Sequence, residues 1–387
     1  MDDIGSFFDG NRNRIVQLCQ ELVRVDTVNP PGNEWRAAEI LEREFRRLNI
    51  PYERLEKEKG RTNLLGRIGK GKPELLIAAH FDTVPFGDGW TREPLGGTEE
   101  NGRVYGRGSM DDKGQLAPLI LAAEYLKKHE SELNGTVVIG GVADEERGSH
   151  AGSKWLTDSK GVHPDYCLVP ECSDSMGMIV IAEKGVLWFR VVINGVQAHG
   201  STPDKGVNAI LLMNEFLAKF RKLKFPARHE TLKKTTINYG IIKGGAATNI
   251  VAGRCELEID VRYVPPYTDK TFLDAAGNVL EEVVTKQQGA SFAVETINHE
   301  PAFFIEPKHP FVQKVRSIAR KTLGHNVRLQ GVGGGTISKD FVRHGAVSIT
   351  FGPGKEEVLH KSDEYIDIPE LVVFGKIVTR VCLETLK

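Results

Sequence analysis

The sequence lacks the features that mark several large classes of protein. It has no excess of charge of one sign, since 51 Lys and Arg stand against 52 Asp and Glu, for a formal net charge of -1. Such a balance provides no basic surface for nucleic acid or for an anionic membrane. No apolar run is long enough to cross a bilayer, and no basic segment followed by an apolar one opens the chain. We therefore expect a cytoplasmic protein with neither nucleic-acid nor membrane partners.

Cysteine is scarce and scattered. The five cysteines form no C-x-x-C pair, and their number is odd. A disulfide framework is therefore not expected, and a reduced chain with free thiols is the simplest interpretation. Cys167 and Cys172 flank an acidic residue considered below, but we do not expect either thiol to bind a metal.

The chain contains enough sequence for two domains. Its 387 residues exceed the usual size of one compact core, and a hydrophobic content of 40% is ordinary for a globular protein. Apolar positions at helical spacing predict helices over residues 11–25 and 34–48. The run "ELLIAAHFD" is continuously apolar, which is typical of a strand covered on both faces. Further alternation of strands and helices predicts an α/β domain with a mostly parallel central sheet.

The alternation of strands and helices typical of an α/β domain stops after residue 178 and resumes near residue 299. The intervening stretch contains hairpin-like alternating strands and two amphipathic helices, "GVNAILLMNEFLAKFRKL" and "DKTFLDAAGNVLEEVVTKQQ". Two helices with about four strands indicate a small α+β sandwich of ferredoxin-like type. We therefore expect a catalytic α/β domain made of residues 1–178 and 299–387, with an α+β domain of residues 179–298 inserted into it.

Acidic side chains and one histidine follow the ends of strands predicted in the larger domain. Open α/β sheets bind ligands outside the carboxyl ends of their strands, so these groups can converge. An imidazole among several carboxylates favours a hard or borderline cation, above all Zn²⁺. A dication would also offset the repulsion within the acidic run of "ADEERGS", which alone would be interpreted as a solvated loop. The candidates are His80, Asp82, Asp111, Asp112, Asp144, Glu145, Glu146 and Glu171.

Four motifs together resemble a known family. They are "HFDTVP", "YGRGSMDDKG", "DEERGS" and a late "LHKSDE". They are similar to the co-catalytic zinc peptidases and deacylases, a family that includes acetylornithine deacetylase, succinyl-diaminopimelate desuccinylase, aminoacylase, carboxypeptidase G and carnosine-type dipeptidases. The resemblance extends over nearly the whole chain, including the inserted domain. It implies a zinc-peptidase-like catalytic domain with two Zn²⁺ per chain, for which Co²⁺ or Mn²⁺ can substitute.

The resemblance assigns metal ligands residue by residue. His80 and Glu171 resemble the ligands of one zinc. Glu146 and His360 resemble the ligands of the other zinc. Asp111 resembles the carboxylate that bridges both ions.

The remaining acids of these motifs resemble other parts of the family's machinery. Glu145 resembles the general base. Asp82 resembles the residue that orients His80, since a ligating imidazole usually donates its second N–H to a carboxylate. Asp112 occupies a position where other members often have methionine, so we assign it no ligand role, and we expect Asp144 to be structural.

The inserted domain and a late loop supply the substrate contacts that the resemblance implies. His199 in "GVQAHGSTPDKG" matches a histidine that reaches into the active site, in dimeric members the active site of the partner subunit, so a homodimer through the inserted domain is implied. Arg262 matches an arginine that binds a substrate carboxylate, although a strand arginine paired with a nearby acid is the alternative. Asn249 matches a substrate-contacting asparagine, with a structural role as the alternative. The glycine-rich loop "GVGGGTISKDF" would line the site with Gly334, Gly335 and Thr336.

The implied function is hydrolysis of the amide bond of an N-acyl amino acid, in the manner of acetylornithine deacetylase or succinyl-diaminopimelate desuccinylase. A dipeptidase or carboxypeptidase of the same family is the alternative, which the second aspartate of "GRGSMDDKG" favours, whereas the chain length and single inserted domain favour a deacylase. A third hypothesis is a non-catalytic relative that binds metal or amino-acid derivatives. Loss of Glu145 or of a ligand would indicate such a relative, and all of them are present.

Overall fold

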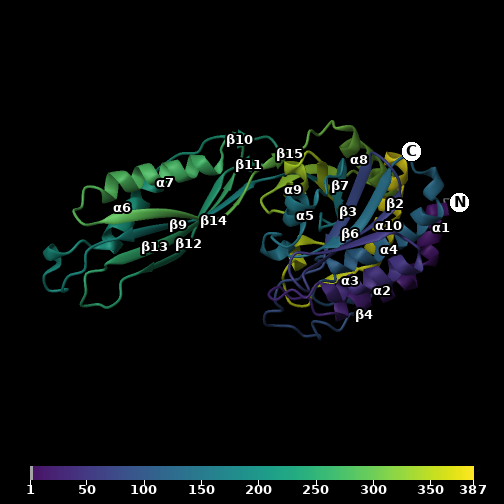
Figure 1. Ribbon diagram of the computed structural model, residues 1–387, viewed down its shortest axis with the longest axis horizontal. Helices are drawn as coiled ribbons and strands as arrows, with labels where there is room; N and C mark the ends of the chain where they lie inside the picture. The colour runs from purple at the N-terminus through teal and green to yellow at the C-terminus, as the bar shows by residue number, and fades with distance from the viewer. Residues whose placement is uncertain (1–2) are drawn as a thin grey trace. The chain divides into compact units, whose positions relative to one another are not determined.

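The computed structural model describes residues 3–387, which form two compact units (Figure 1). The first unit comprises Met1–Ile181, Ile305–Gln330 and Thr336–Lys387. The second unit comprises Ala182–Phe304 and Gly331–Gly335. The chain therefore leaves the first unit and returns to it, so the second unit is an insertion.

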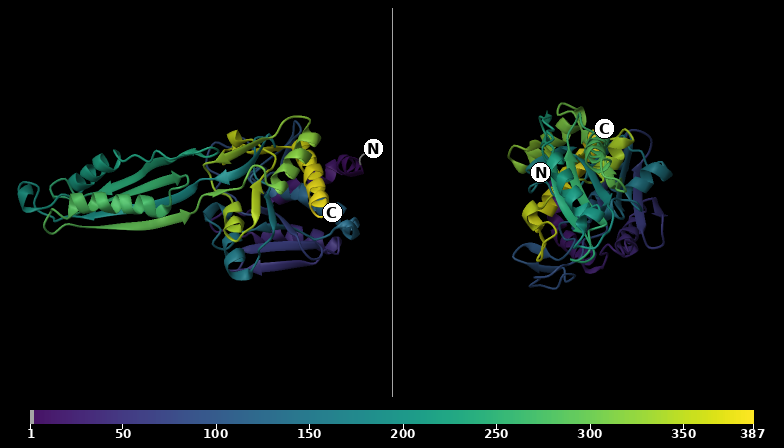
Figure 2. Two further views of the ribbon diagram at one scale, coloured as in Figure 1. Left: turned by 90° about the horizontal axis from the view of Figure 1, so that it is seen from above. Right: turned by 90° about the vertical axis from the view of Figure 1, so that its left-hand side faces the viewer.

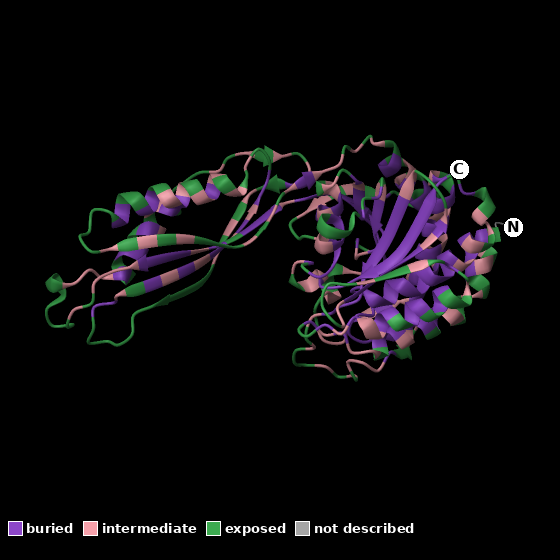
Figure 3. Cartoon of the chain, in the orientation of Figure 1, coloured by how far each residue is buried: buried purple, intermediate pink, exposed green. Residues whose placement is uncertain are grey.

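A nine-stranded mixed sheet is the centre of the first unit, in the order β1-β2-β6-β3-β7-β17-β8-β15, with β16 paired to β8. The four central neighbours β6, β3, β7 and β17 are parallel, and the strands at either end are antiparallel to their neighbours. The central strands are almost wholly buried (Figure 3). The strands are β1 (Tyr52–Glu56), β2 (Thr62–Gly69), β3 (Glu74–His80), β6 (Thr136–Val142), β7 (Tyr166–Val169), β8 (Met178–Glu183), β15 (Phe303–Phe304), β16 (Arg328–Val332) and β17 (Val347–Thr350).

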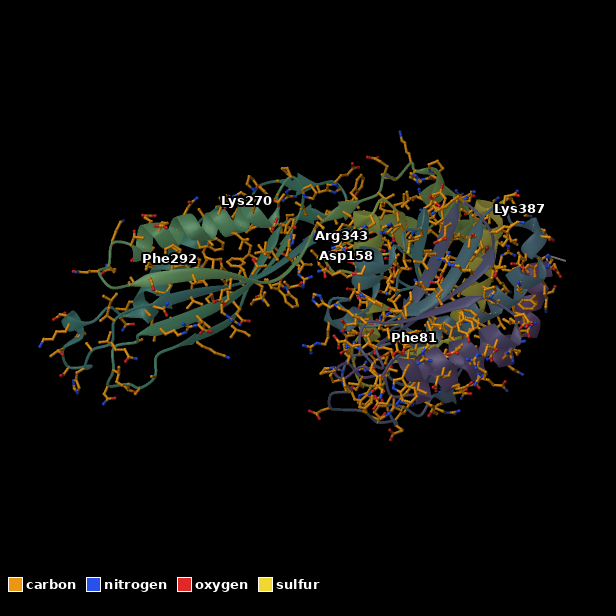
Figure 4. The ribbon with its side chains drawn as sticks, in the orientation of Figure 1. Phe81, Asp158, Lys270, Phe292, Arg343 and Lys387 are labelled. Atoms are coloured by element: carbon orange, nitrogen blue, oxygen red, sulfur yellow. The ribbon has the colours of Figure 1, made fainter. Side chains whose placement is uncertain are left out.

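Helices cover both faces of this sheet, because its strands are apolar on both sides. Alternate residues such as Leu76 and Ala78 pack with α5 and α9 in one core cluster, and an ion pair of 2.8 Å between Asp158 and Arg343 joins these two helices (Figure 4). The other helices include the long, deeply buried α10, which packs on α4 and α8. The helices of this unit are α1 (Asp3–Gly10), α2 (Arg12–Arg24), α3 (Trp35–Arg47), α4 (Leu116–Lys128), α5 (Ser153–Lys160), α8 (Pro310–Leu323), α9 (Ser338–Arg343) and α10 (Ile368–Thr385).

The second unit is a four-stranded antiparallel sheet in the order β12-β13-β9-β14. Two helices, α6 and α7, cover one face and close an apolar core (Figures 1 and 2). This order and the β-α-β-β-α-β succession define a ferredoxin-like fold, so the predicted fold class is confirmed for both units. The elements are β9 (Gly185–Asn194), α6 (Ala209–Phe220), β12 (Thr236–Gly244), β13 (Arg254–Tyr263), α7 (Asp269–Val284) and β14 (Ser291–Glu300), with a small ribbon of β10 (Arg228–His229) and β11 (Lys233–Lys234).

A small three-stranded sheet of the first unit brings together segments that are far apart in the sequence. Its order is β18-β5-β4, and Tyr365, Ile366 and Asp367 pair with Tyr105, Val104 and Arg103. This pairing places the segment of His360 beside the segment of Asp111. The strands are β4 (Thr98–Glu100), β5 (Arg103–Tyr105) and β18 (Tyr365–Asp367).

The length and polarity of the helices agree with the absence of long apolar runs in the sequence. Among residues 3–387, no helix is both long enough and apolar enough to cross a membrane.

Candidate metal centre

Three neighbouring parallel strands present the candidate residues at their carboxyl ends. His80 is the last residue of β3 and pairs with Val142, the last residue of β6. Glu145 and Glu146 follow β6 in a short 3-10 helix, η3 (Glu145–Arg147), and Glu171 follows β7, the other neighbour of β3. The parallel register therefore brings these side chains to one edge of the sheet, where ligands of open α/β sheets bind.

The Asp111 carboxylate lies between two imidazoles. Its Oδ1 is 3.0 Å from His80 Nε2, and its Oδ2 is 3.1 Å from His360 Nε2. The same nitrogen of His360 is 3.5 Å from Glu146 Oε1. Ligand atoms of His80, Asp111 and Glu146 all lie within 4.8 Å of one another. A carboxylate that offers one oxygen to each of two imidazole nitrogens has the arrangement of a ligand shared by two cations.

The chemistry of these donors fits a divalent cation. Glu146 Oε1 is buried and accepts no hydrogen bond in the structure. A buried carboxylate oxygen without a donor is costly, and a bound dication would remove that cost. Imidazole nitrogens among carboxylate oxygens form a borderline donor set that suits Zn²⁺ and its neighbours in the first transition row. His80, Asp111, Glu146 and His360 would hold such ions.

The electrostatics of the cluster show a surplus of buried carboxylate. Burial and the charge of Glu171 raise the pKa of Glu145 well above its ordinary value, and burial and Asp111 raise the pKa of Glu146. The neighbouring carboxylates of Asp111 and Glu146 raise the pKa of His360 to about 10. Protons or cations must therefore neutralise this site, and metal ions that displace protons from such ligands bind more tightly as the pH rises.

Asp82 contacts both the ring of His80 and the turn of Glu145. Its carboxylate oxygen is 3.6 Å from His80 Nδ1, whereas its backbone carbonyl oxygen is 2.9 Å away and accepts the hydrogen bond from Nδ1. The carboxylate instead accepts from the backbone N–H groups of Glu145 and Glu146, at 3.0 and 3.2 Å. The residue therefore fixes the ring through its carbonyl group and the turn of Glu145 through its side chain. Asp112 accepts from the backbone N–H of His80 at 3.1 Å.

A buried network that the sequence did not indicate supports the same turn. Asp144 has a left-handed backbone, with φ of 65°, and accepts from Arg61 Nη2 at 2.7 Å and from Asn29 Nδ2 at 3.0 Å. Arg61 also pairs with Glu34, whose side chain is 0% exposed, at 2.7 Å. Asn29 extends the network to the Asp82 carboxylate at 2.8 Å. Asn29, Glu34 and Arg61 are isolated in the sequence, without a spacing pattern that could have marked them.

His199 and Asn249 are neighbours in the second unit. His199 pairs with Ile250 in an isolated bridge, and the N–H of Gly200 donates to the Asn249 carbonyl oxygen at 2.8 Å. The N–H of Ser201 donates to His199 Nδ1 at 3.1 Å. Because Nδ1 accepts this bond, the neutral ring carries its proton on Nε2. The exposed ring therefore offers a hydrogen-bond donor.

Arg262 lies on the open face of the second unit's sheet. Its Nε is 2.8 Å from Asp260 Oδ1, and its Nη1 donates to the Gly333 carbonyl oxygen at 3.3 Å. The guanidinium also lies 5.9 Å from the ring centre of Trp188, which is 40% exposed. The predicted loop residues Gly334 and Gly335 are exposed, and Thr336 accepts from the N–H of Ser338 at 3.1 Å, a contact that caps α9.

Comparisons with known proteins agree with this fold. The family model described as peptidase family M20/M25/M40 matches residues 76–384. Acetylornithine deacetylase of Proteus mirabilis is 32% identical over 346 residues, which cover 87% of this chain and 86% of that protein. The acetylornithine deacetylase of Pectobacterium carotovorum is 33% identical over 312 residues, or 79% of this chain and 78% of that protein.

Solved structures extend the comparison. A tripeptidase of Staphylococcus aureus is 26% identical, with a TM-score of 0.81 and coverage of 97% of this chain and 99% of that chain. A dinuclear metal binding peptidase of Bacillus subtilis shares the fold at 15% identity, with a TM-score of 0.73 and coverage of 98% and 99%. The fold, the site and these relatives define a hydrolase that acts on amide bonds. The chain belongs to peptidase family M20/M25/M40.

Proposed function

We propose that the chain is a dizinc deacylase that hydrolyses the amide bond of an N-acyl amino acid, in the manner of acetylornithine deacetylase. The observation that carries this proposal is the Asp111 carboxylate, which offers one oxygen to the Nε2 of His80 and the other to the Nε2 of His360. The names of the more similar relatives support the deacylase activity. Co²⁺ or Mn²⁺ would substitute for Zn²⁺.

The proposed ligands divide between two ions. His80 and Glu171 would hold one ion, Glu146 and His360 would hold the other, and Asp111 would serve as a ligand of both. Zinc in such a site polarises the substrate carbonyl and lowers the pKa of water. The Glu145 carboxylate accepts the proton of the attacking water and later delivers it to the departing amine. Asp82 keeps Glu145 in place by accepting the N–H groups of its turn.

Residues of the second unit supply the substrate contacts in this proposal. His199 Nε2–H donates to the oxygen that becomes negative as the carbonyl is attacked. Arg262 binds the substrate carboxylate through its guanidinium fork. Asn249 and the loop of Gly334, Gly335 and Thr336 provide further polar contacts.

We also propose that the enzyme is a cytoplasmic homodimer that associates through the second unit. The edge strand β12 exposes Ile241 and Ile242 (47% and 57% exposed), and the neighbouring helix α6 exposes Leu211 (66%). An unpaired strand edge with apolar side chains is a surface that a second copy can cover.

A dipeptidase or carboxypeptidase of the same family is the second candidate. The observation that favours it is the tripeptidase of Staphylococcus aureus, whose structure matches 97% of this chain with a TM-score of 0.81. Both candidates cleave an amide bond beside a free carboxylate, so they share the same site and differ in the acyl side of the substrate.

One panel of substrates tests the two candidates together. The zinc-loaded and cobalt-loaded proteins would be assayed on N-acetylornithine, N-succinyl-diaminopimelate, other N-acyl amino acids and simple dipeptides. The proposal expects the highest kcat/KM for an N-acyl amino acid. A higher kcat/KM for dipeptides would support the second candidate, and no turnover with two bound metals would overturn both.

Replacing Arg262 with alanine is expected to lower kcat/KM for carboxylate-bearing substrates by about 10- to 100-fold, because a charge-assisted hydrogen bond contributes about 1.5–3 kcal/mol. The measurement compares each substrate with its carboxamide analogue, which should lose much less. Arg190→Ala is the matched control, since Arg190 lies on the same sheet and pairs with Glu258 at 2.8 Å. Equal losses on the acid and the amide would contradict an anchoring role for Arg262.

Replacing His360 with alanine is expected to reduce the bound zinc from two ions per chain to one or fewer, because it removes the only imidazole proposed for the second ion. Metal content would be measured by mass spectrometry after zinc loading and desalting. His150→Ala is the control, since His150 is an exposed histidine close in sequence to Glu146. Unchanged zinc content in His360→Ala would remove this residue from the ligand set.

A further inference from the structure

A fully buried ion pair joins the two segments that carry Asp111 and His360. Arg107 Nη1 lies 2.7 Å from Glu364 Oε2, and the side chains are 1% and 0% exposed. The two residues are 257 positions apart in the sequence. Burying such a pair away from water has a large desolvation cost that its attraction often only balances. Stability alone is therefore a weak explanation for its presence next to the metal centre.

The Glu364 carboxylate fixes the loop of Asp111. Its Oε1 accepts hydrogen bonds from three backbone N–H groups, those of Gly108, Met110 and Asp111, at 3.1, 2.9 and 3.1 Å. Three N–H groups that converge on one carboxylate oxygen fix the loop backbone, as in the anion-binding backbone turns known as nests. The position of the Asp111 side chain therefore depends on a residue four positions after His360.

The Arg107 guanidinium contacts the segment that follows His80 and the segment of His360. Its Nη2 donates to the backbone carbonyl oxygens of Phe86 at 3.1 Å and of Pro85 and His360 at 3.4 Å. Pro85 and Phe86 follow the segment of His80 and Asp82. One guanidinium thus contacts the backbone beyond His80, the backbone of His360 and the carboxylate that holds the Asp111 loop.

We propose that Arg107 and Glu364 are positioning residues that set the spacing of His80, Asp111 and His360, and so preorganise the chain for its second metal ion. Neither side chain belongs to the proposed ligand set, so the pair acts through the backbone that carries the ligands. Outer groups that orient metal ligands typically change metal affinity by about 10- to 100-fold. The inference rests on the proposed function, because it takes the ligand set from there.

The chain provides a matched control for this pair. Arg103 and Asp367 form an ion pair of 2.8 Å between strands β5 and β18, directly opposite each other in the register, whereas Arg107 follows β5 and Glu364 precedes β18. Their side chains are 34% and 25% exposed. This second pair joins the adjoining strands, and within residues 3–387 it makes no hydrogen bond to the loop of Asp111 or to His360. Variants of this pair therefore show the effect of losing an ion pair between β5 and β18, without disturbing the hydrogen bonds that position the metal ligands.

Glu364→Gln is the most informative variant. Glutamine keeps one oxygen as an acceptor but turns an NH₂ group toward either the guanidinium or the three N–H donors, none of which can accept it. We expect the variant to bind the second zinc about 10- to 100-fold more weakly in competition with a chromophoric chelator. With Co²⁺ bound, its visible spectrum should change, because the ligands around the second ion are displaced. At limiting metal kcat should fall while KM stays constant, and excess metal should restore much of kcat.

Arg107→Lys tests the same inference from the other member of the ion pair. Lysine keeps the charge but cannot contact Glu364 and the carbonyl oxygens of Phe86 and His360 together, so second-site affinity should again fall. Asp367→Asn and Arg103→Lys should leave metal affinity and the cobalt spectrum unchanged. If Glu364→Gln fails to fold, Arg107→Lys carries the test.

Several outcomes would overturn the inference. Wild-type affinity at both sites with an unchanged cobalt spectrum, in a folded Glu364 or Arg107 variant, would contradict it even if thermal stability fell. An equal loss of metal affinity in the Asp367→Asn control would show that any ion pair next to this strand pairing affects the metal site, and that Arg107 and Glu364 have no special positioning role. Metal affinity and the cobalt spectrum do not depend on catalysis. A wild-type chain that hydrolyses no member of the substrate panel would therefore overturn the proposed function but not this inference.

Discussion

Replacing Glu145 with glutamine should lower kcat by about 10²- to 10⁴-fold, the usual contribution of a general base, while leaving the bound metal in place. Glu145 is half-buried, next to but outside the cluster formed by His80, Asp111 and Glu146. Its N–H donates to Asp82, so the backbone of the turn has no reason to move when the side chain becomes an amide. The measurement is steady-state kinetics on the best substrate of the panel, together with metal content.

The adjacent glutamate provides the contrast for this prediction. Glu146→Gln should lose metal as well as activity, because Glu146 Oε1 is one of the ligand atoms of the cluster. A Glu145→Gln enzyme that keeps more than about a tenth of the wild-type kcat would exclude Glu145 as the base. A Glu145→Gln enzyme that loses metal would place Glu145 among the ligands instead.

The same residue predicts a pH dependence of activity. Burial and the charge of Glu171 raise the pKa of Glu145 well above its ordinary value. Bound cations beside Glu171 would offset the part of this shift that comes from like charge, whereas burial still acts in the metal-loaded enzyme. A base must be deprotonated to act, so kcat/KM should fall as the pH falls through the pKa of Glu145. The residual activity of Glu145→Gln should lack this acid limb. An acid limb that persists unchanged in the variant would belong to another group.

The features that the sequence predicted are those that depend on short-range pattern. The run that ends in His80 is apolar over its whole length, and the structure buries it as a central strand with parallel neighbours on both sides. Because parallel strands share one carboxyl edge, the convergence of Glu146 on His80 was predictable once the strands were recognised, whereas Asp111 follows β5 of the small antiparallel sheet. The ferredoxin-like unit was predictable for the same reason, since its long strands alternate clearly.

The features that the sequence could not predict depend on pairings between distant residues. Strands β5 and β18 have three residues each, too few for a periodicity, and their pairing creates the contact between Arg107 and Glu364. The second set of contacts made by Asp82 could not be predicted, because the two-residue spacing says only that its carboxylate can reach His80. Which acceptor takes the Nδ1–H depends on the turn at Glu145, whose N–H groups occupy that carboxylate.

Replacing Arg61 with methionine should destabilise the first unit by about 3–5 kcal/mol, the cost of removing one partner from a buried ion pair. The Arg61 side chain is 15% exposed and holds Glu34 and Asp144, which are 0% and 8% exposed, both at 2.7 Å. Without Arg61 the two carboxylates face each other with no cation between them. Urea unfolding in the presence of a chelator would measure the loss. Arg328→Met is the control, since Arg328 is 57% exposed and pairs with Asp174, which is 60% exposed, so its loss should be about 0–1 kcal/mol.

The loss in Arg61→Met should grow with pH. Burial raises the pKa of Glu34 to about 6 even though hydrogen bonds from Arg61 lower it. A carboxyl group with a raised pKa binds more protons in the folded state, so the wild-type stability contributed by Glu34 is highest below about pH 4.5 and falls by about 2 kcal/mol as the pH rises through 6. Removing Arg61 raises this pKa further and extends the fall to higher pH. The difference in unfolding free energy between wild type and Arg61→Met should therefore be larger at pH 8 than at pH 5, and the further variant Glu34→Gln should remove most of that dependence. A difference independent of pH would show that Arg61 acts through packing and not through the charge it places between Glu34 and Asp144.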